Sequence, residues 1–429
     1  MADARLSGDA PARRWSWTDP KLRSAVVQAA LAIAIIWMAW SFFANAQANL
    51  ARQGIASGFG FLDNSAGFGI TQTLIPYSES SSYGRAFLVG LLNTLLVAIL
   101  GIIIATILGF LVGVGRLSQN VVVKALSSAF VEITRNLPPL FQIMFWYLAV
   151  LSTMPNPRQS WGFGIQPFLN SLADGAAGLG LGPISQSLRA MAGTAGAPGV
   201  FLSNRGLVVP RPIFEADFGI VAGIFALGIV AAFLVARWAR KRQEATGRQF
   251  PAFWAGLALI VLPAVVAGML LGWPVAFEQP ELRGFNFAGG LRVIPELVAL
   301  VLALSIYTAG FIAEIVRAGI VAVSRGQSEA AHSLGLRSGP TLRLVIIPQA
   351  MRVIVPPLTS QYLNLTKNST LGVAIGYPDL FAIFAGTTLN QTGQAIEIIA
   401  ITMAVYLGIS LLTSALMGLY NKRVALIER

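Results

Sequence analysis

The sequence predicts an all-α membrane protein, a polytopic bundle of about eight transmembrane helices. Two observations lead to this prediction. Of the 429 residues, 55% are hydrophobic and only 11% are charged, whereas an ordinary soluble domain is about 25% charged. The apolar residues also gather in long blocks, and about 20 such residues cross the hydrocarbon core of a bilayer as a helix. A soluble fold is therefore excluded.

Apolar blocks between charged clusters place the expected spans. One span is entered through an amphipathic stretch at 121–134, and another is expected to be interrupted after Pro356-Pro357 and again near Gly372 and Gly376. The predicted spans are 25–43, 87–114, 136–154, 218–236, 252–271, 296–316, the interrupted segment 353–386, and 397–419. The first block, followed by Ala44-Asn45-Ala46, has an alternative interpretation as a signal peptide with its cleavage site. Its length and two tryptophans favour an uncleaved anchor.

Positive charges orient these helices. The net charge is +12, and twenty-one of the thirty Lys and Arg residues fall on the side of the membrane that holds the N-terminus, against eight in the opposite loops. Because cytoplasmic loops carry the excess of Lys and Arg, both termini are predicted to be cytoplasmic. Membrane topology accounts for the basic charge, so we expect membrane lipid and no nucleic acid as a partner.

The chain lacks the residues that metal sites and phosphate-binding loops require. It has no cysteine and a single histidine, His332, and it contains no Gly-Lys dipeptide. A His or Cys metal site and the phosphate-binding Walker A loop are therefore excluded. We expect no catalytic residue, no metal and no cofactor bound by this chain. The energy for any transport must come from a partner or from an ion gradient.

The spans and loops divide the chain into predicted regions. They are a cytoplasmic N-terminal tail (1–24), an extra first span with its outer loop (25–86), and a transmembrane domain (87–429) with an insertion (155–283) and a cytoplasmic loop (317–352). The outer loops 44–86 and 155–217 are long, and the second is rich in Gly, Ala, Ser and Pro, which favours irregular structure. It is either a tolerated insertion or a docking surface for a partner outside the cytoplasm.

The cytoplasmic loop is the most informative segment. Ser328 and Glu329 are typical of the start of a helix, and Gly335 is predicted to end that helix in the left-handed conformation. Ser338-Gly339-Pro340 would start a second helix that Pro348 interrupts. A short helix between two turns is either an ordinary solvated loop or a knob that fits a groove in another protein.

The spacing in this loop decides between these interpretations. This loop resembles the EAA signature of type I ABC importer permeases. The residues that carry the resemblance are Glu329-Ala330-Ala331, Gly335 after three intervening residues, Val345 and Ile347-Pro348. In that family the loop is the coupling helix that docks into the ATPase, which implies this role for Glu329, Ala330, Ala331 and Gly335. Val345 and Ile347 replace the usual Ile and Leu, which conserves volume.

Other stretches are similar to the polar amino-acid branch of that family. They are 83–94, 131–147 and 361–371, although Leu137 and Pro139 depart from the family pattern and predict a sharper bend there. The extra first span, the long loops and the pair at 218–271 resemble the larger permease of general L-amino-acid ABC systems. The expected fold is therefore that of a type I ABC importer permease.

This resemblance implies a non-enzymatic permease subunit that imports L-amino acids across the bacterial inner membrane from periplasm to cytoplasm. It implies as partners an ATP-binding subunit dimer, which holds ATP and Mg, a second permease subunit, favoured as a different chain, and a periplasmic solute-binding protein. The alternative is a secondary amino-acid transporter driven by an ion gradient. Such carriers often show inverted repeats and intramembrane carboxylates, whereas no Asp and few Glu were located in the predicted spans.

Polar residues inside the spans are candidates for the substrate path, because they are costly when they face lipid. Gln361, Asn364 and Asn368 fall on one helical face. Lys367 lies off that face and is assigned to a subunit contact or to the substrate carboxylate, and Ser369 completes the candidate set. The alternative is a polar seam between permease subunits.

Two further polar pairs are interpreted as structural. For Asn93 and Thr94, a role in helix packing is favoured over a role in lining the substrate path. Glu314 and Arg317 are expected to form an i, i+3 ion pair near the cytoplasmic end of their span.

Overall fold

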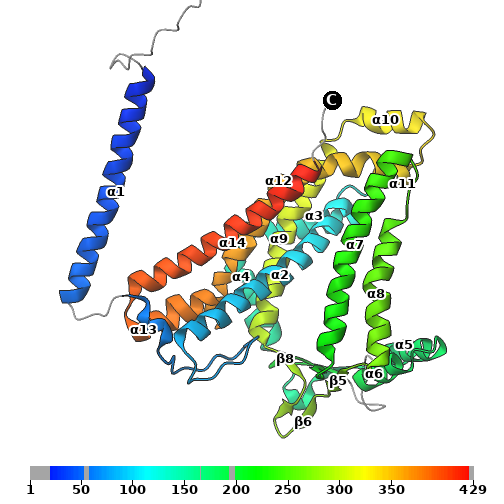
Figure 1. The fold of residues 1–429 in the computed structure, drawn as a ribbon, viewed down its shortest axis with the longest axis horizontal. Coiled ribbons are helices and arrows are strands. Elements are labelled where there is room, and N and C mark those ends of the chain that lie inside the picture. Colours follow the sequence, from blue (N-terminus) through cyan, green and yellow to red (C-terminus); the bar gives the residue numbers. More distant parts are fainter. Residues whose placement is uncertain (1–19, 53–57, 165, 193–198, 425–429) are drawn as a thin grey trace, which may run out of the picture.

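The structure is a computed structural model that describes residues 20–52, 58–164, 166–192 and 199–424. It is mostly helical, as predicted (Figure 1). The longer helices are α1 (Pro20–Arg52), α2 (Tyr83–Gly115), α3 (Val121–Asn136), α7 (Phe218–Thr246), α8 (Ala252–Leu270), α9 (Pro295–Val321), α12 (Ile347–Asn368) and α14 (Ala395–Val424). The shorter segments are η1 (Phe59–Asp63), α4 (Pro139–Met144), η2 (Phe145–Leu151), η3 (Pro157–Gln159), α5 (Gln166–Gly178), α6 (Gly182–Ala192), α10 (Arg325–Ser333), α11 (Ser338–Thr341), η4 (Leu342–Ile346), η5 (Ser369–Ile375), η6 (Phe381–Thr388) and α13 (Leu389–Thr392).

Within the described residues, seven helical stretches are long and apolar enough to cross a membrane. They are Arg23–Asn45, Tyr83–Gly115, Phe218–Thr246, Ala252–Leu270, Pro295–Val321, Ser338–Ile375 and Ala395–Asn421. Each matches one of the eight predicted spans. The remaining predicted span, 136–154, is a shorter apolar helix, Pro139–Leu151. Helix α3 stops at Asn136 because Leu137 precedes a proline and adopts the extended backbone (φ −98°, ψ 130°) that this position favours.

The centre of the bundle is the contact between α2 and α9, which α12 and α3 join. Glycines make it close: a Cβ added at Gly109 would lie 2.6 Å from the Cβ of Ile312, and one at Gly113 would lie 2.7 Å from the carbonyl oxygen of Ala313. Small residues allow helices in a membrane to approach in this way. The largest side chains in the resulting core are fully buried, among them Leu300, Leu304, Ile312, Ile354 and Leu365.

Helix α12 corrects one prediction and confirms another. The sequence predicts a break after Pro356-Pro357, but α12 continues through both prolines to Asn368. Packing explains this, because Ile354, Val355 and Leu358 around the prolines are buried, and tertiary contacts hold a proline-containing helix together. The predicted second interruption is confirmed, since the 3-10 segment η5 ends at Gly376 with φ +78°.

The outer insertion contains strands as well as irregular loops, so an all-α description is incomplete. The strands are β1 (Trp161–Phe163), β2 (Val200–Ser203), β3 (Gly206–Val209), β4 (Arg211–Phe214), β5 (Val275–Glu278), β6 (Glu281–Arg283), β7 (Asn286–Ala288) and β8 (Leu291–Val293). They form one antiparallel sheet in the order β1-β2-β3-β8 and two antiparallel pairs, β4-β5, whose strands are separated in the sequence by α7 and α8, and the hairpin β6-β7. Short runs of Val, Leu and Phe between the glycines favour these strands, which composition alone had hidden.

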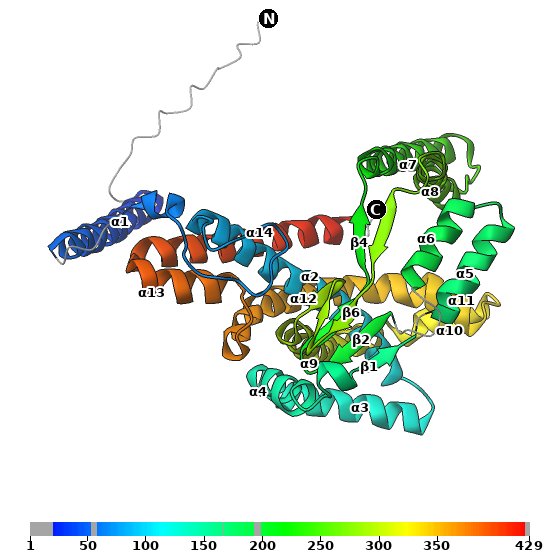
Figure 2. The ribbon, with the colours of Figure 1, turned by 90° about the horizontal axis from the view of Figure 1, so that it is seen from below.

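The strands and the coupling loop lie at opposite ends of the molecule. Figure 1 shows β6 and β8 at one end, and α10 near the end of α14 at the other. Helices α7 and α8 stand at the side of the bundle with α5 and α6 close by, as the view from below shows (Figure 2). Helix α1 stands apart, and its most apolar window has no buried residue.

Candidate functional site

The predicted coupling helix is α10, and it begins earlier than expected. Its N-cap is Ser324, not Ser328. Ser324 has an extended backbone (φ −55°, ψ 134°) and its hydroxyl makes no capping bond. The backbone turn after α9, rather than side-chain capping, therefore sets the start of α10.

The end of α10 is as predicted. Gly335 adopts φ +80°, the left-handed conformation that glycine adopts without steric cost. The Leu336 amide donates to the Ala331 carbonyl at 3.1 Å, and the Gly335 amide donates to the His332 carbonyl at 2.9 Å. The His332 ring also lies 2.9 Å from the Leu336 carbonyl through Nδ1. A Cβ at Gly335 would meet no atom within 4 Å, so backbone conformation, not space, requires the glycine.

Helix α10 presents most of its surface to the outside. Glu329 and Ala330 are exposed, whereas Ala331 is 4% exposed and packs inward. Leu334, next to Gly335, is 83% exposed. An exposed apolar side chain can anchor a protein interface. The sequence analysis missed Leu334, although an apolar residue in an otherwise polar helix was a visible signal.

A side-chain hydrogen bond links α10 to α12, which follows α11 and η4 in the sequence. The Gln349 side chain of α12 donates through Nε2 to Gln327 Oε1 at 3.0 Å. Within α10, the Ser333 hydroxyl donates to the Glu329 carbonyl at 2.9 Å. The hydrogen bond between Gln349 and Gln327 is a direct contact between α10 and α12.

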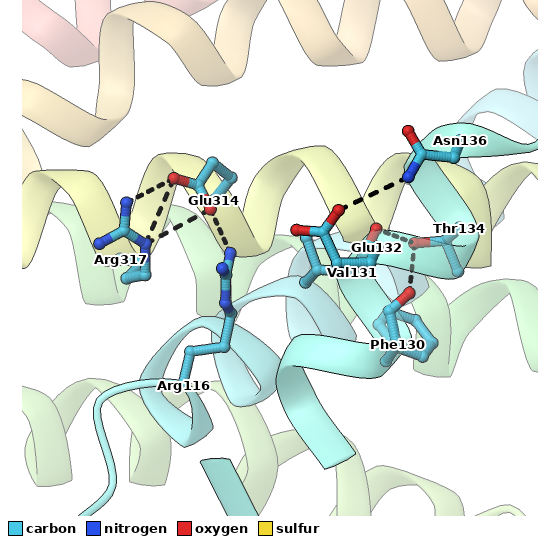
Figure 3. A network of polar contacts seen from close by, with 8 residues as sticks. All are labelled: Arg116, Phe130, Val131, Glu132, Thr134, Asn136, Glu314 and Arg317. Carbon is cyan, nitrogen blue, oxygen red and sulfur yellow. Dashed lines mark hydrogen bonds and ion pairs between the residues drawn. The ribbon is translucent and has the colours of Figure 1, made fainter. Parts of the chain in front are cut away.

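A charge network lies where α9 leads toward α10 (Figure 3). Arg317 Nη2 lies 2.6 Å from Glu314 Oε1, which confirms the predicted i, i+3 pair. Arg116, at the end of α2, also donates to Glu314, and the sequence analysis missed it because the two are far apart in the chain. The same view shows Thr134 of α3 donating to the Phe130 carbonyl at 2.8 Å. One carboxylate thus joins the C-terminal ends of α2 and α9.

The candidate path residues divide between two sides of α12. Asn364 and Lys367 are exposed, and Gln361 and Asn368 are half-buried. Lys367 therefore shares the open side with the amides. Ser369 is fully buried, and its hydroxyl donates to the Thr366 carbonyl at 2.8 Å. Four of the five candidates are exposed at least in part, and Ser369 is not.

A buried carboxylate inside the predicted span 353–386 corrects the expectation that these spans contain no Asp. Asp379 is fully buried, and its Oδ1 accepts from the Ala382 amide at 2.8 Å. Tyr406 of α14 donates to Oδ2 at 3.4 Å. Proline followed by aspartate at the start of η6 was the available signal, because Asp satisfies free amides at a helix start.

Asn93 and Thr94 hold the same turn, as their interpretation as packing residues predicted. Asn93 Nδ2 donates to the Pro378 carbonyl at 2.8 Å, and Thr94 Oγ1 accepts from the Leu380 amide at 3.0 Å. Both side chains are fully buried. They attach α2 to the interruption after α12.

Comparison with known proteins agrees with this geometry. Residues 219–426 match the family described as binding-protein-dependent transport system inner membrane component. The chain is 48% identical to the general L-amino acid transport system permease protein AapQ of Rhizobium johnstonii, over 99% of this chain and 98% of that protein. It is 49% identical to the putative amino-acid ABC transporter permease protein YhdX of Escherichia coli strain K12, over 96% of this chain and 97% of that protein.

A third relative shows that the long outer insertion is shared. The chain is 41% identical to the glutamate/glutamine/aspartate/asparagine transport system permease protein BztB of Rhodobacter capsulatus, over 96% of each chain. Identity over nearly complete chains decides against the alternative of an ion-driven secondary transporter. The chain is a multi-pass inner membrane protein of the ABC transporter permease family, the inner membrane components of binding-protein-dependent transport systems.

Proposed function

We propose that this chain is a permease subunit of an importer that moves L-amino acids from the periplasm to the cytoplasm. Relatives that match almost its whole length are named as amino-acid permeases, which supports this substrate class. A separate ATP-binding subunit dimer would hold ATP and Mg and supply the energy. Both termini would be cytoplasmic, because the excess of Lys and Arg lies on their side.

The exposure of α10 is the observation that carries the proposed coupling. Glu329, Ala330, Ala331 and Gly335 would form the docking knob, with Leu334 as its apolar anchor, since this leucine is 83% exposed. An apolar anchor in a pocket, surrounded by polar contacts, is the usual energetic centre of a protein interface. The bond from Gln349 to Gln327 would pass movement of α10 to α12.

The open face of α12 would line the substrate path. Gln361, Asn364 and Asn368 can replace water around the charged groups of an amino acid, which are costly to bury without polar partners. Lys367 is on the same open side and would meet a neighbouring subunit or the substrate carboxylate. Ser369 would act indirectly, since its bond to the Thr366 carbonyl shapes the end of α12.

Two further partners complete the proposed assembly. A periplasmic solute-binding protein would contact the outer end, where the loops 44–86 and 155–217 lie. A second permease would be a different chain, because one Escherichia coli strain carries two distinct proteins, GltJ and GltK, both named as glutamate/aspartate import permeases.

The variants Glu329→Lys and Gly335→Pro test the proposed coupling. Proline fixes φ near −65° and cannot adopt the +80° of Gly335, while lysine reverses the exposed charge. We expect uptake to fall at least about tenfold, the equivalent of about 1.4 kcal/mol of lost docking energy, with normal amounts of this chain in the membrane. Uptake of radiolabelled amino acids and co-purification of the ATPase measure the two effects.

Glu244→Lys is the matched control, because Glu244 is an exposed carboxylate at the end of α7 on the same end of the molecule. This variant should transport normally. Normal uptake by both α10 variants would show that α10 is not the coupling element.

A further inference from the structure

A cavity opens at the outer end of the molecule, where five distant parts of the chain meet. Its volume is about 520 Å³, which is in the range of small-molecule sites. We call it the outer cavity, and its lining includes Tyr147, Asn204, Arg205, Arg292, Glu296 and Gly376. Residues of the β2–β3 turn and of β8 thus face the start of α9 and the end of η5.

Two guanidinium groups of the outer cavity have no carboxylate partner in the described chain. Arg205 donates to the Asn286 side chain, and Arg292 donates through Nε to the Arg205 carbonyl at 3.3 Å. The ion pairs found among the described residues involve neither arginine. These neutral acceptors leave both positive charges available. A guanidinium offers several N–H donors in a planar fork that suits a carboxylate.

The outer cavity also holds one carboxylate that lacks a basic partner within the described residues. Glu296 accepts from the Tyr147 hydroxyl at 3.0 Å and takes part in none of the ion pairs found there. A hydroxyl fixes the orientation of the carboxylate without neutralising it. Glu296 therefore remains available to a cation.

Among the residues that line the outer cavity, Asn204 has a side-chain oxygen without a hydrogen-bond partner in the described structure. The Oδ1 atom of Asn204 is buried, and no donor reaches it in the described structure. The backbone around it is fixed, because the Asn204 amide donates to the Pro155 carbonyl at 2.9 Å. A buried acceptor left unpaired is costly, so a donor from a ligand would satisfy it.

We infer that the outer cavity binds an acidic L-α-amino acid. Its two carboxylates would meet Arg205 and Arg292, and its ammonium group would meet Glu296, with Asn204 as a further acceptor. Two cations and one anion in the site match the two anions and one cation of such a ligand. A neutral amino acid would leave one guanidinium without a partner, so it should bind more weakly.

The position of the outer cavity connects it with the proposed path. Gly376 ends η5, which continues directly from the polar face of α12. Arg205 and Asn204 come from the outer insertion, so this inference gives the insertion a part in substrate recognition. The inference rests on the proposed function, since it adds a site to the same route.

Direct binding of radiolabelled L-glutamate to the complete transporter tests this site. The complex is placed in nanodiscs without the solute-binding protein, and Arg205→Gln, Arg292→Gln and Glu296→Gln are compared with the native chain. We expect the dissociation constant for L-glutamate to rise by about tenfold to a hundredfold in each variant, because each loses a charge-assisted contact.

L-Glutamine distinguishes a lost contact from a distorted sheet. It has nearly the shape of glutamate but lacks the second carboxylate, so Arg205→Gln and Arg292→Gln together should cost glutamate more affinity than glutamine. Glu296→Gln should weaken both ligands. Arg283→Gln is the matched control, because Arg283 lies in the outer strands and pairs with Glu281 at 3.1 Å; it should bind both ligands as the native chain does.

Three outcomes would overturn the inference: no binding of L-glutamate by the native complex, unchanged binding in all three variants, or equal losses for glutamate and glutamine. An effect confined to the affinity for the solute-binding protein would make this surface a protein contact instead. Uptake by the native complex separates the two proposals. ATP hydrolysis without uptake of any amino acid would contradict the proposed function, whereas normal uptake with unchanged binding contradicts only the acidic site.

Discussion

The α2–α9 contact and the α7–α8 contact are equally close but differ in what surrounds them. A Cβ added at Gly109 of α2 would lie 2.6 Å from the Ile312 side chain, and one added at Gly228 of α7 would lie 2.6 Å from the Leu259 carbonyl oxygen. In the most apolar window of α9, however, 61% of the residues are buried, whereas in that of α7 the share is 6%.

This difference shows that a close contact between two helices does not by itself make those helices part of the buried core. Helices α2 and α9 each contact α12 and α3, while the main helix partner of α7 in the described chain is α8. A lesion in the first contact therefore disturbs the helix that carries the proposed path. A substitution in the second contact is expected to disturb only α7 and α8.

The largest expected effect is that of Gly109→Leu. The leucine side chain would overlap Ile312, and overpacking of this kind costs about 3 kcal/mol or more in a closely packed core. We expect a large loss of folded protein from the membrane fraction and no measurable uptake. Thermal unfolding in detergent and radiolabelled uptake would show both effects.

Gly228→Leu tests the other side of the comparison. It should open the α7–α8 pair and lower the thermal stability, yet leave a bundle that still transports. Gly223→Leu, also in α7, is the control, because a Cβ there meets nothing within 4 Å. Equal loss of uptake in Gly228→Leu and Gly109→Leu would contradict the separation of the two regions.

The sequence predicted the core of this fold better than its edges, and the reason is physical. Spans follow from the length and polarity of the chain itself, and the turn at Gly335 follows from one residue's allowed backbone conformation. The passage of α12 through Pro356, the link from Arg116 to Glu314 and the pairing of β3 with β8 depend on contacts between distant segments. No local pattern contains that information.

The proposed coupling helix could be predicted from the sequence as a helix that ends at Gly335, whereas the outer cavity could not. The pattern around Glu329 is contiguous, whereas Arg205 and Glu296 meet only after the strands pair and α9 begins beside them. Asp379 was visible as proline followed by aspartate, but only the fold shows that it is buried against Tyr406. A site made from one segment can be predicted from sequence, whereas a site made from five distant segments cannot.

The next largest effect is expected for Glu314→Gln, in the core region. The Glu314 side chain is 28% exposed and that of Arg116 is 15% exposed. Removing the shared carboxylate leaves two guanidiniums close together without their anion. Because breaking a fully buried pair costs 3–5 kcal/mol and an exposed pair at most about 1 kcal/mol, we expect a loss of about 2 kcal/mol here.

Thermal unfolding of the purified subunit complex measures this loss, and the conservative variant Glu314→Asp should recover part of it. ATP hydrolysis stimulated by substrate should also weaken, since the network lies just before α10. A stability equal to that of the native chain would show that the two arginines find other partners, and it would make the network irrelevant to the packing of α2 on α9.

A smaller effect on stability and a specific one on transport are expected when Gln361, Asn364 and Asn368 are all replaced by alanine. Alanine favours the helix, so folding should be unchanged within about 1 kcal/mol. The apparent substrate affinity should change about tenfold, because amides that replace water around the substrate are lost. Uptake kinetics over several amino acids would measure this change.

The amide of Gln28 provides the matched control, since it is exposed on α1, outside the packed bundle. Gln28→Ala should leave affinity and selectivity unchanged. Unchanged kinetics in the triple variant, together with loss of assembly in Lys367→Ala, would identify the polar face of α12 as a seam between subunits.

The smallest effect is expected for Glu281→Gln at the outer end, and it completes the comparison with Glu314. Arg283 Nη2 lies 3.1 Å from Glu281 Oε2, a single contact that is longer than the 2.6 Å between Arg317 and Glu314. The two side chains are also 75% and 66% exposed. Water screens the charges and the free side chains move, so an exposed pair contributes at most about 1 kcal/mol and often nothing measurable. Thermal unfolding of Glu281→Gln should therefore match the native protein, at low salt and at high salt alike. A loss close to that of Glu314→Gln would mean that β6 and β7 are covered in the assembled transporter, and that burial by a partner rather than by this chain sets the strength of the pair.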